Sequence, residues 1–434
     1  MEWLGLIGVI AGLAFLVAAI YKGFSLVIAA PLATMIVVIF NGMPFIASMF
    51  GPEGSYMAGL AKFLLGNFPV FLFGAILAKY MDKSGAALSI ARTLMRLVGT
   101  SSPYRALVAL LVISAVLTYG GINIFVVIFI LIPMAMPIFA QYDIPRPLII
   151  IPIFGGGATF TMTMLPASPA LHNVVPSNAL KTPLTAAPVA GVLCTIAAIA
   201  FLMFYMKVSL TAAQKRGEHF DGEVGEVASD DRKVPSFAVA VLPIVVLLGM
   251  IFALSFVKQI ILFALFASII LAAVLFHPYV DHKATINGGT TDSLGSVFTT
   301  GSTIAFGSFA VSVPAFESVF NAIQSIPGGP LVTLSVTTML LAGITASSVG
   351  AEGIAVGQFG PDAIAAGVNA EIVHRMVAVS AGASLFPHNG FLAVFNNLAG
   401  LTLRNSFTRA FISMHVPTYI GIVIILILAN FGIA

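Results

Sequence analysis

Glu352 and His388 are titratable side chains that lie in interruptions of long apolar stretches. An apolar environment favours the protonated form of a carboxyl group, and a nearby anion favours that form further. Histidine titrates near neutral pH and can donate to a carboxylate or relay a proton. These two residues predict proton carriage coupled to the binding of an anion. The alternative interpretation makes Glu352 a helix cap at the membrane surface and His388 a satisfied residue at a helix break.

Hydroxyl, amide and glycine residues gather at four such interruptions, and they form our candidate substrate-binding set. The set is Thr118, Tyr119, Gly120, Gly121, Asn123, Thr161, Thr163, Ser168, Ser347, Ser348, Gly350, His388 and Asn389. Their polar groups can hydrogen-bond a carboxylate and a neighbouring hydroxyl. Helices that begin at an interruption add free N–H groups and positive dipole ends, which suit an anion without a buried arginine. The alternative for each Ser or Thr is a hydrogen bond to its own backbone.

For His172 and His374, structural interpretations compete with functional ones. His172 resembles His388 by position, because it follows a proline-rich interruption of the first half. It is either a second polar site residue or a satisfied core histidine. His374 and Arg375 open an apolar stretch, and we interpret them as a basic flank at its outer end.

The four interruptions form two pairs in the same order. TYGGIN at 118–123 is echoed by SSVGAEG at 347–353, and LPASP at 165–169 is echoed by FPHNG at 386–390. The apolar segment FGAIL at 73–77 is likewise echoed by FGSFA at 306–310. Paired interruptions in two halves indicate the binding site of a secondary transporter.

The composition of the chain indicates the environment in which it folds. Hydrophobic residues make up 59% of the 434 residues, charged residues only 8%, and the mean hydropathy is +1.08. Ordinary soluble domains carry about 25% charged residues. The apolar residues occur in runs long enough for membrane helices, which predicts an all-α polytopic membrane protein. The single cysteine, Cys194, excludes a disulfide framework and a thiolate metal site.

Five crossings are expected in each half. They are 4–20, 24–40, 60–78, 148–174 and 184–206 in the first half, and 237–256, 260–276, 299–313, 374–398 and 410–431 in the second. The segments 148–174 and 374–398 are broken in the middle. Segments 104–139 and 331–367 divide into two short arms, which predicts two re-entrant helical hairpins.

An odd number of crossings per half inverts the second half relative to the first. With the central linker placed inside, 15 of the 19 Lys and Arg residues lie inside and 4 outside. We therefore expect an N-terminal repeat at 1–206, a cytoplasmic linker at 207–236 and an inverted C-terminal repeat at 237–434. Both termini are expected on the periplasmic or extracellular side.

Several motifs resemble one known family. FGAILAK at 73–79 with DKSGAA at 82–87 resembles the gluconate permease (GntP) family. VLTYGG at 116–121, TFTMT at 159–163 and LFPHNG at 385–390 are similar to a bacterial branch of hydroxybutyrate-type permeases. The resemblance covers nearly the whole chain and implies the ion transporter superfamily architecture of inverted repeats, hairpins and broken helices. It also implies a homodimer in the bacterial inner membrane that takes up sugar acids or small hydroxy acids with protons.

One motif departs from that family. Gluconate-type members carry a His-Pro-rich motif near the first break, whereas this chain has LPASP at 165–169. This difference favours a short hydroxy-monocarboxylate such as 3-hydroxybutyrate over gluconate.

We expect proton-coupled symport by alternating access, with Glu352 or His388 carrying the proton. The alternatives are a sodium-coupled di- or tricarboxylate symporter and a cation/proton antiporter of the same architecture. Enzymatic activity is not expected, because the sequence has no His-Glu-x-x-His motif and no nucleophile elbow. The expected partners are a small organic anion, a proton (or sodium) and membrane lipid, with no cofactor, metal or nucleic acid.

Overall fold

The computed structural model describes residues 2–87, 89, 90, 93, 102–119, 124–168, 170–222, 233–254 and 259–433. Within these ranges the secondary structure is helical and contains no strand. The helices with the length and composition to cross a membrane are α1 (Glu2–Tyr21), α4 (Tyr56–Lys83), α11 (Pro188–Lys215), α14 (His282–Ser312) and α20 (Leu403–Asn430). The prediction of an all-α polytopic membrane protein is therefore confirmed.

Shorter helices complete the first half of the chain. They are α2 (Leu26–Phe40), α3 (Phe45–Phe50), α6 (Pro103–Tyr119), α7 (Ile124–Gln141), η1 (Arg146–Ile149), α8 (Ile150–Gly155), η2 (Gly156–Phe160), α9 (Thr161–Thr163) and α10 (Leu171–Leu180).

Shorter helices also complete the second half of the chain. Its shorter helices are α12 (Phe237–Ala253), α13 (Ile260–Leu275), η4 (His277–Tyr279), η5 (Pro314–Phe316), α15 (Glu317–Gln324), α16 (Pro330–Thr345), α17 (Ser348–Ala365), α18 (Ala370–Ser380), η6 (Ala381–Ala383) and α19 (Gly390–Ala399). The helix pair α16–α17 corresponds in order to α6–α7, and α18–α19 corresponds to α8–α10.

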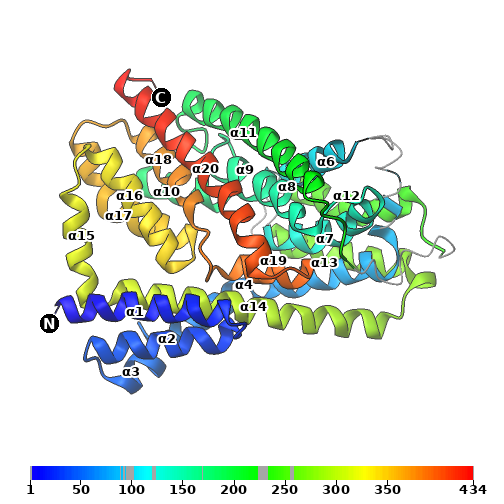
Figure 1. Cartoon of the computed structure of the whole chain (residues 1–434), viewed down its shortest axis with the longest axis horizontal. Coiled ribbons are helices and arrows are strands. Elements are labelled where there is room, and N and C mark those ends of the chain that lie inside the picture. The colour runs from blue at the N-terminus through cyan, green and yellow to red at the C-terminus, as the bar shows by residue number, and fades with distance from the viewer. Residues whose placement is uncertain are drawn as a thin grey trace.

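The long helices α4 and α14 lie side by side along one edge of the molecule (Figure 1). A Cβ on Gly289 would lie 2.6 Å from the Cα of Ile76, so the two backbones are in close contact. Lys79 and Asp292 form an ion pair of 2.9 Å near the same end. Hydropathy predicts that this helix begins at residue 299. α14 instead begins at His282, because its polar first third packs against α4 through these contacts.

The helices are interrupted at the glycine- and proline-rich segments, as the sequence predicts. A π-helical segment, η2, precedes α9, and helix resumes only at α10 after the proline-rich segment. In the second half, helix stops at Ala383 and resumes at Gly390. Between α16 and α17, Ala346 adopts the left-handed region with φ of 49°. The corresponding first-hairpin residues 120–123 lie outside the described ranges.

Gly307 positions the second hairpin against the long helix α14. A Cβ there would lie 2.2 Å from the Cα of Thr345, the last residue of α16. Only glycine permits this approach without displacement of the backbone. The repeated FG motif at 306–307 therefore places the hairpin tip directly on α14.

The first part of the central linker is attached to the rest of the chain. α11 continues to Lys215, beyond the predicted boundary at residue 206. His219 Nδ1 lies 2.5 Å from Asp143 Oδ2, and the Phe220 N–H donates to Asp143 Oδ1 at 2.9 Å. These hydrogen bonds lower the pKa of Asp143 below its ordinary value, the His219 bond most of all.

Candidate functional site

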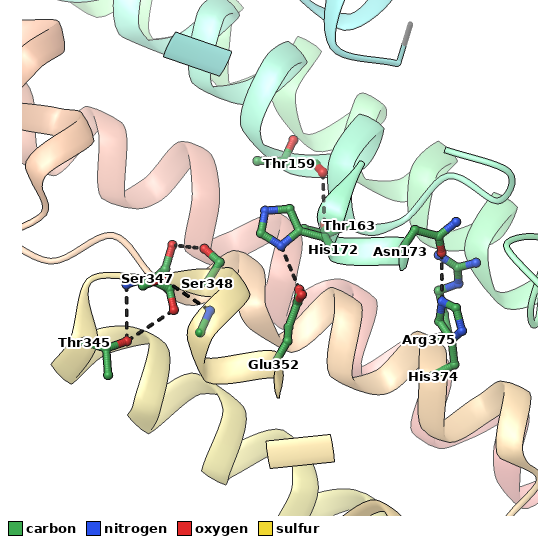
Figure 2. A network of polar contacts seen from close by, with 12 residues as sticks. Thr159, Thr163, His172, Asn173, Thr345, Ser347, Ser348, Glu352, His374 and Arg375 are labelled. Carbon is green, nitrogen blue, oxygen red and sulfur yellow. Dashed lines mark hydrogen bonds and ion pairs between the residues drawn. The ribbon is translucent and has the colours of Figure 1, made fainter. Parts of the chain in front are cut away.

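Glu352 forms a hydrogen bond with His172, and the two residues come from different halves of the chain. Glu352 lies in the second turn of α17, just after the hairpin tip, and His172 is the second residue of α10. Glu352 Oε1 and His172 Nδ1 are 2.7 Å apart (Figure 2). Glu352 is fully buried and His172 is 8% exposed. The cap interpretation of Glu352 is wrong, because its carboxyl group lies in the protein interior.

The second oxygen of Glu352 is buried without a hydrogen-bond partner in the described part of the chain. Leaving a buried polar atom unsatisfied costs about 1–3 kcal/mol. Native proteins keep few such atoms, and those that persist often serve a function. Glu352 thus combines complete burial, one titratable partner and one unsatisfied oxygen.

The equivalent contact in the other half is apolar. Phe391 is the second residue of α19, as His172 is of α10, and its ring packs 5.2 Å from that of Phe125 on α7. Phe154 of α8 adds a second ring at 4.8 Å from Phe391. Of these two contacts between a hairpin and the broken helix of the other half, one therefore carries a titratable pair and the other carries aromatic rings.

His388 faces a backbone carbonyl. Its Nε2 donates to the carbonyl of Ile344 at 3.3 Å, near the end of α16, and its Nδ1 has no partner among the described residues. The structure brings Glu352 together with His172 and not with His388. The sequence signal for His172 was its position just after the first proline-rich interruption, which resembles that of His388 within the second.

Hydroxyl pairs connect each hairpin to the broken helix of its own half. Thr118 Oγ1 at the end of α6 lies 2.8 Å from Thr161 Oγ1 of α9. In the second half, Ser348 Oγ at the start of α17 lies 2.8 Å from Ser384 Oγ. These four hydroxyls occupy comparable places in the two halves, so the predicted hydroxyl clusters are brought together at both breaks.

Other predicted residues make local hydrogen bonds. Thr163 donates to the Thr159 carbonyl, and Ser168 accepts from the Ala170 N–H. Further local bonds are Ser347 accepting from the Gly350 N–H and Asn389 accepting from the N–H groups of Phe391 and Leu392. Tyr119 differs, because its hydroxyl donates across 47 residues to the Pro166 carbonyl at 3.3 Å. These side chains shape the interrupted backbone, as their alternative interpretation predicts. Gly120, Gly121 and Asn123 lie outside the described residues.

His374 and Arg375 are fully buried, so their interpretation as an exposed outer flank is wrong. Asn173 Oδ1 accepts from His374 Nε2 at 2.8 Å and from Arg375 Nη1 at 3.4 Å (Figure 2). Arg375 Nη2 also donates to the Ala186 carbonyl at 2.6 Å. These partners belong to the other half of the chain, and the sequence gives no sign of that proximity. A buried guanidinium thus bonds to Asn173, the residue that follows His172 in the chain.

His415 and Thr418 of α20 are buried polar residues that were not among the predicted site residues. Both ring nitrogens of His415 lack a partner in the described ranges, and the ring packs against Phe411 and Phe386 at centroid distances of 3.7 and 5.5 Å. Thr418 Oγ1 likewise has no partner among the described residues, and it would lie 2.5 Å from a Cβ on Gly382 of η6, just before the second break. The available signal was a histidine in the middle of a membrane helix, which is a functional candidate by default.

Comparisons with known proteins find one matching family model and related transporters. The family model described as GntP family permease matches residues 4–281. The uncharacterized transporter YxjC of Bacillus subtilis is 31% identical over 457 residues, covering 94% of this chain and 95% of the relative. An uncharacterized transporter of Haemophilus influenzae is 27% identical over 195 residues, covering 45% of this chain and 44% of the relative.

Proposed function

Because the chain belongs to the GntP permease family, we propose that it is a secondary active transporter that carries a small organic anion together with a proton. The proposed substrate is a short hydroxy-monocarboxylate such as 3-hydroxybutyrate, or a sugar acid such as gluconate. The proposed setting is the bacterial inner membrane, as a homodimer with both termini periplasmic and the linker cytoplasmic.

The buried pair Glu352–His172 carries this proposal. Its two residues join the second hairpin to the first broken helix, so movement of either element relative to the other changes the environment of the carboxyl group. An intramembrane carboxyl group in such a position is a common proton carrier. Arrival of an anion near Glu352 favours its neutral form, which links proton uptake to substrate binding.

The hydroxyl pairs provide the complementary contacts for substrate. Thr118–Thr161 and Ser348–Ser384 lie at the hairpin-to-break junctions. A hydroxy acid offers a carboxylate acceptor and a hydroxyl that both donates and accepts. Helices α10, α17 and α19 each begin at an interruption, and their positive dipole ends favour the carboxylate. The start of α10 has no side-chain cap, whereas Ser347 and Asn389 cap α17 and α19.

The proposal is tested by uptake into proteoliposomes under an imposed pH gradient, with and without sodium. We expect accumulation of 3-hydroxybutyrate or gluconate to follow the pH gradient and to be independent of sodium. Accumulation that follows sodium and ignores the pH gradient would refute proton coupling and support the sodium-coupled alternative.

A substitution separates coupling from binding. Glu352→Gln keeps a hydrogen-bonding side chain but removes the titratable group, so we expect loss of pH-driven accumulation with substrate exchange retained. Glu317→Gln, on the exposed first turn of α15, is the matched control and should behave as wild type. Full pH-driven accumulation by Glu352→Gln would remove Glu352 from the coupling step.

A further inference from the structure

Helices α10, α17 and α18 are joined pairwise by polar side chains, so they form a closed triangle. The first corner is the Glu352–His172 hydrogen bond between α17 and α10. The second joins α10 to α18 through Asn173, the residue after His172. The third joins α18 to the start of α17 through Ser384 and Ser348, because α18 continues into η6 without a gap and η6 ends at Ser384. The proposed proton site and one proposed substrate contact are therefore corners of one three-helix unit.

Hydrogen bonds occupy both polar atoms of the Asn173 side chain. Its Nδ2 donates to the carbonyls of Ser168 and Leu184 at 3.0 and 2.6 Å, so its Oδ1 faces α18. That oxygen accepts from His374 Nε2 at 2.8 Å and from Arg375 Nη1 at 3.4 Å (Figure 2). Because the start of α10 has no side-chain cap, this network fixes its first turn, which carries the proton-site histidine.

Two charged residues of α18 strengthen the same corner. Glu371 Oε2 accepts from the Ala187 N–H at 2.8 Å, and Arg375 Nη2 donates to the Ala186 carbonyl at 2.6 Å. That N–H and that carbonyl belong to one peptide unit, so a carboxylate and a guanidinium one helical turn apart hold it from both ends. Hydrogen bonds to charged groups are about twice as strong as neutral ones. The start of α11 is therefore attached to α18 together with α10.

The Ser348–Ser384 corner is the weakest of the three. One neutral hydrogen bond of 2.8 Å closes it, and Ser348 is only half-buried. A hydroxy acid that bonds to these two hydroxyls replaces their bond with each other. α18 is then free to shift relative to α17, and α10 moves with α18 because their shared corner is stronger.

We propose that Asn173, held by His374 and Arg375, is a positioning residue that transmits substrate binding at the second interruption to the carboxyl group of Glu352. When the hydroxyl corner opens, His172 moves with α18 away from Glu352, and a buried carboxyl group without its imidazole partner favours its protonated form. By thermodynamic linkage, protonation then strengthens substrate binding by the same factor. The inference rests on the proposed function and adds to it the path between the two sites.

Few other groups near this unit can titrate. The remaining charged or titratable side chains on the three helices are Asp362, Glu371, His374 and Arg375. The neighbouring helices α9, α16 and η6 carry none, and His388 lies at the second interruption, bonded to the carbonyl of Ile344. A variant without the Glu352 carboxyl group therefore identifies the group that takes up the proton.

The coupling is measured as the ratio of the dissociation constants of 3-hydroxybutyrate at about pH 8 and about pH 6, by equilibrium binding to the purified protein. Wild-type protein should bind about fivefold or more tightly at the lower pH, and Glu352→Gln should show no difference. Asn173→Ala and His374→Leu should each reduce the ratio to below about twofold. His374→Gln keeps a donor toward Asn173 and should retain most of the ratio.

Two milder variants show that the effect is specific. Thr182 Oγ1 lies 2.7 Å from His374 Nδ1 near the surface, so Thr182→Val should fold and lower the ratio part of the way. Ser380→Ala is the matched control on α18, because it removes a buried hydrogen bond of 3.0 Å to Ser335 that lies outside the triangle. Its ratio should equal that of wild-type protein.

Infrared difference spectra give a second readout that a loss of stability does not change. Addition of 3-hydroxybutyrate to wild-type protein at about pH 8 should produce the carbonyl band of a newly protonated carboxyl group. The band should be absent in Glu352→Gln, weak in His374→Leu and largely restored in His374→Gln.

The outcomes separate the two proposals. Wild-type protein that binds neither 3-hydroxybutyrate nor gluconate, or binds them equally at both pH values, refutes the proposed function. A wild-type ratio that is unchanged in His374→Leu and Thr182→Val refutes the positioning role alone. A ratio lowered as much by Ser380→Ala also refutes that role, because any lost buried hydrogen bond would then have the same effect.

Discussion

Replacing His172 by alanine should destabilise the folded protein by about 1–3 kcal/mol, the usual cost of leaving a buried polar group without its hydrogen-bond partner. The structural reason is that Glu352 is fully buried and its Oε2 already lacks a partner among the described residues, so the hydrogen bond from His172 is the one that its carboxyl group makes there. Glu352→Met in the same background removes the carboxyl group that is left unsatisfied. The double variant should therefore be more stable than His172→Ala alone by about 2 kcal/mol or more.

The assay is a double-mutant cycle on the free energy of unfolding, measured by reversible denaturation in mixed micelles. The control pair is Lys79–Asp292, which has the same short distance but side chains that are 27% and 41% exposed. Exposed ion pairs contribute about 0–1 kcal/mol, so its coupling energy should be much smaller. The Glu352→Met single variant and the double variant should both lose pH-driven accumulation as well.

Additive effects of His172→Ala and Glu352→Met, to within about 0.5 kcal/mol, would refute the reasoning. They would mean that the two side chains do not stabilise each other in the membrane. A coupling energy equal to that of Lys79–Asp292 would equally show that burial does not strengthen the pair.

Three further predictions test other parts of the structure. Gly307→Ala should destabilise the protein by about 1–3 kcal/mol, because the new Cβ would lie 2.2 Å from the Cα of Thr345; Gly357→Ala, which meets nothing within 4 Å, should be neutral or slightly stabilising in the same thermal-unfolding measurement. His415→Phe removes two unpaired ring nitrogens and should raise the unfolding temperature while lowering the transport rate; wild-type transport would show that the imidazole has no role. Because hydrogen bonds from His219 and Phe220 hold the pKa of Asp143 below its ordinary value of 3.8, their stabilising effect is present above pH 3.8 and is lost as pH falls through the lowered pKa. Asp143→Asn should therefore speed amide exchange at Phe220 at pH 7, and unchanged exchange would contradict the attachment of the linker.

Local composition was sufficient to predict the class of the protein and many helix boundaries. The predicted crossings 237–256 and 260–276 agree closely with α12 and α13, because their ends are marked by charged or polar residues. The interruptions around Pro166 and Pro387 were also predictable, since proline and glycine end helices through their own backbone chemistry.

Long-range pairing was not predictable from a single sequence. The start of α14 was misplaced because its polar first third is stabilised by contact with α4, which hydropathy does not include. Arg375 looked like a membrane flank because its partners, Asn173 and Ala186, lie about 200 residues away in the chain.

The same contrast applies to the candidate site. By itself the sequence determined that Glu352 lies in an apolar region near a helix break, because burial and interruption follow from neighbouring residues. It could not determine which of two similarly placed histidines meets that carboxyl group. The tertiary structure decided in favour of His172, because α17 packs against α10 of the other half and brings Oε1 within 2.7 Å of Nδ1. It also decided that the equivalent contact, Phe125 with Phe391, is apolar, so the two similar halves differ in chemistry at one junction.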